Sequence, residues 1–118
     1  MENNLYQKSY SFAIRVVELS KYLIVEKREY ILSKQFLRSG TSIGANVAEA
    51  NGAISKNDFS FKMYTAYKEC LESKYWLSLL KDTGYISQDT FETLFADADE
   101  LAKILYTIIN KSRDRKYQ

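Results

Sequence analysis

Six polar residues of this 118-residue chain lie at spacings that could support chemistry. They are Arg38, Ser42, Asn46, Glu49, Glu69 and Glu72. The first four are separated by four, four and three residues and therefore share one face of a helix. The last two lie three residues apart in a later helical segment. Brought together from neighbouring helices, the three carboxylates would resemble those of a di-iron bundle or of an acid–base pair.

The composition argues against both chemistries. Di-iron bundles use a Glu-x-x-His motif, and the chain has no histidine, so a metal site would need oxygen ligands alone. Hydrolysis by paired carboxylates needs a cleft, and a tightly packed bundle offers none that is obvious. The single cysteine, Cys70, falls in an apolar helical pattern and is expected to be a buried, inert thiol. We therefore expect no enzymatic activity, no cofactor and no metal.

The six residues are better interpreted as a polar network between two helices or between subunits. Arginine suits this role because its planar fork can bind two carboxylates at once. Such a network would fix register and partner choice more than it adds stability. On this interpretation, replacing Arg38 or Glu69 by alanine should disrupt assembly.

A stripe of small residues lies beside this network. Gly40, Gly44 and Ala48 recur every four residues, although each glycine inside a helix costs about 1 kcal/mol relative to alanine. A sequence tolerates that cost where another backbone must come close. We assign Gly40 and Gly44, like the polar network, to helix packing and assembly.

Apolar residues at three- and four-residue spacings predict four amphipathic helices. We expect the first over about residues 4–27 and the second over 31–51. The third begins at Ser55, which is followed three residues later by an acid, and the fourth begins at Ser87. Four long helices with short connectors predict an all-α, antiparallel up-down-up-down four-helix bundle that forms a single domain over residues 1–118.

More apolar surface is present than the seam of one bundle requires. The first helix has a second stripe beside its core stripe, and the third helix carries aromatic rings around its circumference. The second stripe consists of Tyr6, Tyr10, Ala13, Val17 and Ile24. The ten tyrosines combine an apolar body with a polar tip, which suits interfaces. Unless these rings only widen the core, they and the glycine stripe predict self-association.

The net charge of +2 is too small to indicate nucleic-acid binding by itself. Acids precede bases along the last helix, which suits the helix macrodipole but would also create a basic end that could meet phosphate. The basic residues at this end are Lys111, Arg113, Arg115 and Lys116. A second and less dense cluster, expected at the opposite end of the bundle, consists of Lys27, Arg28 and Lys34.

The N-terminal residues lack the order of a signal peptide, and no apolar run reaches membrane-spanning length. We therefore expect a cytoplasmic protein with no membrane partner.

Two runs of sequence resemble a known family. They are residues 35–50, QFLRSGTSIGANVAEA, and residues 66–77, AYKECLESKYWL, together with the pair Phe12-Ala13. These runs are similar to those of the four-helix-bundle proteins named for intervening sequences in bacterial 23S rRNA genes. The resemblance implies a homopentameric barrel of up-down bundles. A relative serves diversity-generating retroelements as an accessory protein that binds nucleic acid and the reverse transcriptase.

The residues and the resemblance together predict a non-enzymatic homo-oligomeric scaffold, a pentamer by resemblance. We expect it to bind RNA or single-stranded nucleic acid through symmetric copies of the C-terminal basic cluster. The alternative is a scaffold for a protein partner, with no nucleic-acid role. Phosphate binding should weaken steeply with salt, whereas a partner held by aromatic side chains should tolerate salt.

Overall fold

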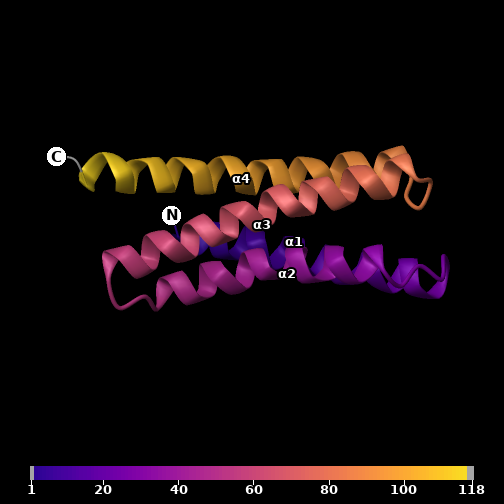
Figure 1. Ribbon diagram of the computed structural model, residues 1–118, viewed down its shortest axis with the longest axis horizontal. Helices are drawn as coiled ribbons and strands as arrows, with labels where there is room; N and C mark the ends of the chain where they lie inside the picture. Colours follow the sequence, from indigo (N-terminus) through magenta and orange to yellow (C-terminus); the bar gives the residue numbers. More distant parts are fainter. Residues whose placement is uncertain (1, 117–118) are drawn as a thin grey trace.

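The computed structural model describes the backbone of residues 2–116 and the side chains of residues 4–111. The described backbone forms four helices, α1 (Glu2–Val25), α2 (Leu32–Asn51), α3 (Lys56–Asp82) and α4 (Gln88–Lys116). Each helix runs opposite to the one before it, and α1 is also a neighbour of α4 (Figure 1). The predicted all-α, up-down-up-down bundle is confirmed. Both ends of α1 and α2 and the starts of α3 and α4 lie within two residues of the expected positions.

The core contains the apolar residues that the helical spacing selects. On α1 the apolar side chains that follow the three- and four-residue spacing of the core stripe are all buried; they are Leu5, Phe12, Val16, Leu19 and Leu23. On α3 and α4 the expected core positions are likewise buried, except that Phe59, Phe91 and Ile108 remain partly exposed at its edge. One apolar stripe from each helix therefore fills the core.

The helix starts expected at Ser55 and Ser87 are confirmed by their hydrogen bonds. The Ser55 hydroxyl accepts from the amide of Asp58 at 3.0 Å, and the Ser87 hydroxyl accepts from the amide of Thr90 at 3.1 Å. Each serine thus satisfies an amide that has no partner in the first turn of its helix.

The start of α2 is held by an acidic residue of the turn that precedes it. Arg28 has a φ of 51°, in the left-handed region, and the chain then buries Glu29. The Glu29 carboxylate accepts from the amides of Ile31, Leu32 and Ser33 at 3.2, 3.0 and 2.7 Å. Burial acts to raise the pKa of Glu29, but these hydrogen bonds outweigh it and lower the pKa below its ordinary value.

The glycine stripe marks a close approach of two helices of the same chain. A Cβ atom added at Gly40 would lie 2.7 Å from both methyl groups of Val16 on α1. One added at Gly44 would lie 3.4 Å from the Ser9 hydroxyl and 3.5 Å from its backbone. The close backbone is therefore that of α1, and Ala48 is exposed. The stripe therefore explains helix packing within one chain. We had expected it also to support self-association, and it does not.

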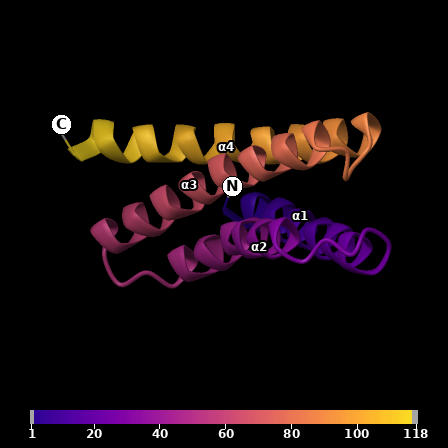
Figure 2. The ribbon, with the colours of Figure 1, turned by 45° about the vertical axis from the view of Figure 1, so that its right-hand side comes forward.

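The four helices do not remain equally close along the bundle. In both views α3 lies beside α4 near the turn that joins them and slants away from it toward the end of α2, so the C-terminal end of α4 stands apart from α3 (Figures 1 and 2). The whole molecule is a rod with extents of 51 × 22 × 21 Å. Its long sides are consequently the surfaces with room for a large interface.

We expect Gly40→Ala to destabilise the protein and Gly44→Ala to leave its stability nearly unchanged. Alanine gains about 1 kcal/mol over glycine within a helix, but overpacking against the stiff Val16 side chain costs about 1–3 kcal/mol. A net loss of about 1 kcal/mol at Gly40 follows. Urea denaturation at one protein concentration measures it. Val16→Ala makes room for the new methyl group, so the double variant should lose less than the two single variants combined; strict additivity would contradict the contact.

Removing the Glu29 cap should lower the free energy of unfolding at neutral pH. We expect Glu29→Ala to cost about 1–2 kcal/mol, as for other helix caps, whereas Glu26→Ala in the same exposed connector should cost little. Because the folded-state pKa of Glu29 is lowered, the cap stabilises above the ordinary glutamate pKa of about 4.3 and is lost as the pH falls through the folded-state value. The difference between wild type and Glu29→Ala should therefore shrink at about pH 2. Equal losses for both variants at neutral pH would rule out the capping role.

Candidate functional site

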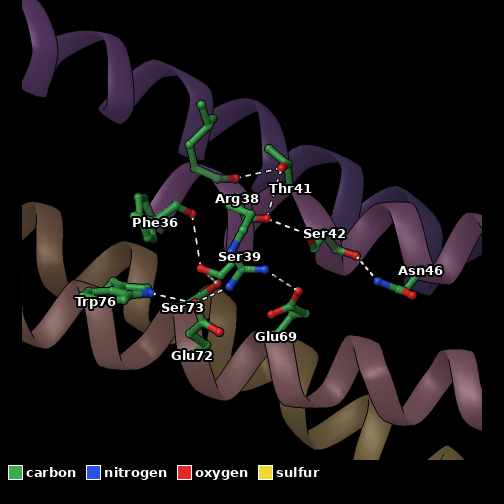
Figure 3. Close-up of polar contacts among 11 residues, drawn as sticks. Phe36, Arg38, Ser39, Thr41, Ser42, Asn46, Glu69, Glu72, Ser73 and Trp76 are labelled. Atoms are coloured by element: carbon green, nitrogen blue, oxygen red, sulfur yellow. Dashed lines mark hydrogen bonds and ion pairs between the residues drawn. The ribbon is translucent and has the colours of Figure 1, made fainter. Parts of the chain in front are cut away.

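Arg38 joins α2 to α3 by binding two carboxylates (Figure 3). Its Nη1 donates to Glu69 at 3.0 Å, and its Nη2 donates to Glu72. The indole Nε1 of Trp76 donates to the same Glu72 oxygen at 2.9 Å. The Arg38 side chain is 50% exposed, so water weakens the attraction and the pairing contributes direction more than stability.

The hydrogen bonds among Arg38, Glu72 and Trp76 lower the pKa of the acid and raise the pKa of the base. The Trp76 donor, followed by the Arg38 donor, lowers the pKa of Glu72, although partial burial opposes them. The hydrogen bonds that Arg38 makes to Glu72 and Glu69 raise the pKa of its guanidinium. Arg38 and Glu72 therefore each favour the charged form of the other.

The other three residues of the predicted network do not join it. The Ser42 hydroxyl donates to the Arg38 carbonyl at 2.7 Å, and the Asn46 amide donates to the Ser42 carbonyl at 2.8 Å, so both bond to their own helix (Figure 3). Glu49 instead accepts from Lys62 of α3 at 2.7 Å. A single network of six residues is thus wrong, because serine and asparagine find nearer acceptors on the preceding turn.

A buried contact between two serines lies beside Arg38 and was missed by the sequence interpretation. The Ser73 hydroxyl donates to that of Ser39 at 3.0 Å, and both residues are fully buried. The Ser39 hydroxyl in turn donates to the Phe36 carbonyl at 3.3 Å (Figure 3). Two small polar residues at core positions of adjacent helices were the available signal. Their pairing satisfies hydroxyls that would be costly to bury alone.

The three carboxylates of a di-iron-like site do not converge. Glu49 pairs with Lys62, while Glu69 and Glu72 face Arg38. Within the residues that the structure describes, no group of three histidine, cysteine or acidic side chains could hold a metal ion. The prediction for Cys70 is confirmed, since the thiol is buried and burial raises its pKa to about 12.

Most of the surplus aromatic and aliphatic residues lie on the surface, whereas Tyr67 and Trp76 of α3 are partly buried against the core. On α1 the second stripe is exposed, with Tyr10 at 57% and Val17 at 36%, and only Ala13 is partly covered. We call this set, with Tyr6 and Ile24, the α1 stripe. On α3 an exposed row, here called the α3 stripe, consists of Phe61, Tyr64, Leu71 and Tyr75. The exposed rings of these two stripes do not widen the core.

The two basic clusters lie at opposite ends of the rod, as predicted. Lys27, Arg28 and Lys34 are exposed around the turn between α1 and α2. Lys111 is exposed near the far end of α4 (Figure 1). The other members of the C-terminal cluster, Arg113, Arg115 and Lys116, lie outside the residues whose side chains are described. Across the described chain, no helix has both the length and the apolar character to cross a membrane.

The fold and the site define an antiparallel four-helix bundle whose second and third helices are joined by an arginine–carboxylate cluster. Residues 1–107 match the family described as 23S rRNA-intervening sequence protein. The chain belongs to this family, which confirms the resemblance seen in the sequence.

A solved structure has the same fold. It is the crystal structure, at 1.70 Å resolution, of a protein of unknown function from Bacteroides thetaiotaomicron, assigned to the S23 ribosomal protein family. The two sequences are 47% identical, and the match covers 92% of this chain and 97% of the other with a TM-score of 0.91. The comparison with curated proteins found no match.

The single tryptophan, Trp76, makes the cluster observable in solution. Because hydrogen bonds lower the pKa of Glu72, its protonation should change Trp76 fluorescence with a midpoint below about 4.3, the ordinary value for glutamate. Arg38→Ala removes one of these bonds and should move the midpoint upward. Glu72→Gln should abolish the transition while the protein stays folded by circular dichroism. A midpoint that Arg38→Ala leaves in place would show that the guanidinium does not act on Glu72.

Proposed function

We propose that this protein is a non-enzymatic scaffold in the cytoplasm, built from copies of itself as a ring of five chains, that binds RNA or single-stranded nucleic acid. The observation that carries the assembly is the exposed apolar surface. The α1 and α3 stripes remain uncovered although the core of the bundle is already complete. Monomeric proteins rarely leave such rows in water.

The nucleic-acid part of the proposal is supported by charge and by family. Lys111 begins a basic end that continues through Arg113, Arg115 and Lys116 in the sequence. Symmetry would repeat this weakly basic end around a ring, so several modest contacts would act on one strand. The family description names an rRNA gene context, which makes RNA the first ligand to test.

Light scattering of the purified protein with a short single-stranded RNA tests both parts. We expect a pentamer that gains mass with RNA at low salt and loses it as salt rises, by a log–log slope of about 0.7 per phosphate contact on a single strand. Replacing the four C-terminal bases by glutamine should abolish the gain. The matched control replaces Lys27, Arg28 and Lys34 at the other end and should leave binding intact.

Three results would contradict the proposal in different ways. A monomer would remove the scaffold itself. A pentamer that ignores RNA at every salt concentration would favour the alternative, a protein partner held by the exposed aromatic residues. RNA binding that is lost with the control cluster instead would place the site at the turn between α1 and α2.

A further inference from the structure

Two shallow clefts between helices of the bundle differ in charge and in aromatic content. The α1–α4 cleft, of about 310 Å³, contains two cations that are each paired with an acid of their own. Phe12 borders this cleft, but its ring is buried in the core. The α3–α4 cleft, of about 350 Å³, instead contains a pair of tyrosine rings beside two lysines that share one acid. Both volumes lie near the lower end of the range for small-ligand sites, about 300–1,000 Å³.

The aromatic surface of the α3–α4 cleft is provided by Tyr106. Its ring lies against that of Tyr67, with centroids 5.9 Å apart and planes inclined by 42°. Tyr67 is packed against the core, whereas Tyr106 is 54% exposed, so Tyr67 supports the Tyr106 ring without covering it. Leu71 and Ala102 add apolar surface to the walls. An exposed ring held in one position offers a face on which a planar group such as a nucleobase can stack.

One carboxylate serves both lysines of this cleft. Asp99 pairs with Lys74 at 2.8 Å and with Lys103 at 3.0 Å. Lys74 also lies over the Phe95 ring, 5.0 Å from its centroid, and its side chain is largely covered. The Lys103 side chain is 79% exposed and can turn toward a ligand while Lys74 continues to neutralise Asp99. The group therefore retains one positive charge for an anion.

The cleft lies on the same face of α4 as the first base of the C-terminal cluster. Lys103, Thr107 and Lys111 are spaced by four residues and so form one row along the helix. Lys103 and Thr107 line the cleft, and Lys111 follows about 6 Å further along the helix. Toward this end α4 separates from α3 (Figure 1), and Lys111 is exposed. A strand whose phosphates followed this row would pass directly beside Tyr106.

We propose that an unpaired base of a single-stranded nucleic acid stacks on Tyr106 in the α3–α4 cleft, and that Lys103 binds the adjoining phosphate. The inference rests on the proposed RNA-binding function and specifies where a base is held. In a duplex the neighbouring bases cover both faces of each base, so this site selects single strands. The base is assigned to the α4 wall because Leu71, on the α3 wall, belongs to the α3 stripe that the proposed assembly would cover.

Fluorescence anisotropy with a short labelled oligouridine tests the stacking contact. Tyr106→Ala should weaken binding at least about fivefold, which is the lower value for loss of one stacked base. The slope of affinity against salt should stay unchanged, because the ring carries no charge. Tyr106→Phe keeps the ring and should bind like wild type. Tyr30→Ala is the matched control, since that ring is 59% exposed but lies in the turn between α1 and α2.

The phosphate contact is tested by charge variants. Lys103→Gln should weaken binding and lower the salt slope by about 0.7, the value for one phosphate of a single strand. Asp99→Asn should strengthen binding, because it removes a negative charge and releases Lys103. Lys8→Gln, in the α1–α4 cleft, is the matched control and should keep the wild-type slope. A duplex of the oligouridine with oligoadenylate should not respond to Tyr106→Ala.

The possible failures are separable once circular dichroism and light scattering establish that each variant keeps the wild-type fold and mass. A wild type that binds no single strand at any salt concentration would remove the proposed function and this site together. Binding that Tyr106→Ala and Lys103→Gln leave unchanged would overturn the site alone, with the C-terminal cluster as the remaining contact. Equal losses for Tyr106→Phe and Tyr106→Ala would also overturn stacking. If Tyr106→Ala does not fold, Lys103→Gln decides, because that side chain is exposed.

Discussion

The close contact between α1 and α2 is the constraint on which the rest of the bundle depends. Gly40 leaves space for the Val16 methyl groups, and Gly44 leaves space for Ser9, so the two backbones approach where a larger residue would hold them apart. This contact fixes which face of α1 points inward. It thereby also fixes that Tyr10 and Val17 point out beside the small residues of α2.

Apolar contacts stabilise the four-helix bundle, and polar contacts set the alignment of its helices. The core carries most of the stabilisation, because its apolar side chains are removed from water. The ion pairs at Arg38 and at Arg15 are partly exposed and add little free energy. These ion pairs instead constrain geometry. The Arg38 guanidinium can bind both Glu69 and Glu72 only at one alignment of α2 and α3. The buried Ser39–Ser73 contact fixes the same alignment from inside.

Beside these polar contacts, exposed apolar rows remain on the surfaces of α1 and α3. A bundle that carries exposed apolar rows on two of its helices is suited to the self-assembly proposed above. The ends of the rod, where both basic clusters lie, would then form the rims of the ring. A scaffold for an extended polyanion needs such a repeated, weakly basic rim more than it needs a deep pocket.

The sequence by itself determined the helices, their boundaries, the core residues and the membership of the family. These follow from local interactions, because apolar periodicity and serine caps act within a few residues. The sequence also indicated the Arg38, Glu69 and Glu72 cluster, since one arginine and two acids fell on helix faces that a bundle brings together.

Only the tertiary structure decided which helix fills the glycine stripe and which polar residues pair. Gly40 needed a close neighbour, and periodicity could not say whether that neighbour was α1 or another chain. Glu49 accepts a hydrogen bond from Lys62 because the rotation of α2 and α3 brings that donor close. Glu29 accepts from the first amides of α2 because the left-handed turn at Arg28 directs the chain there. Such choices depend on distances between segments remote in sequence, and side-chain periodicity carries no information about those distances.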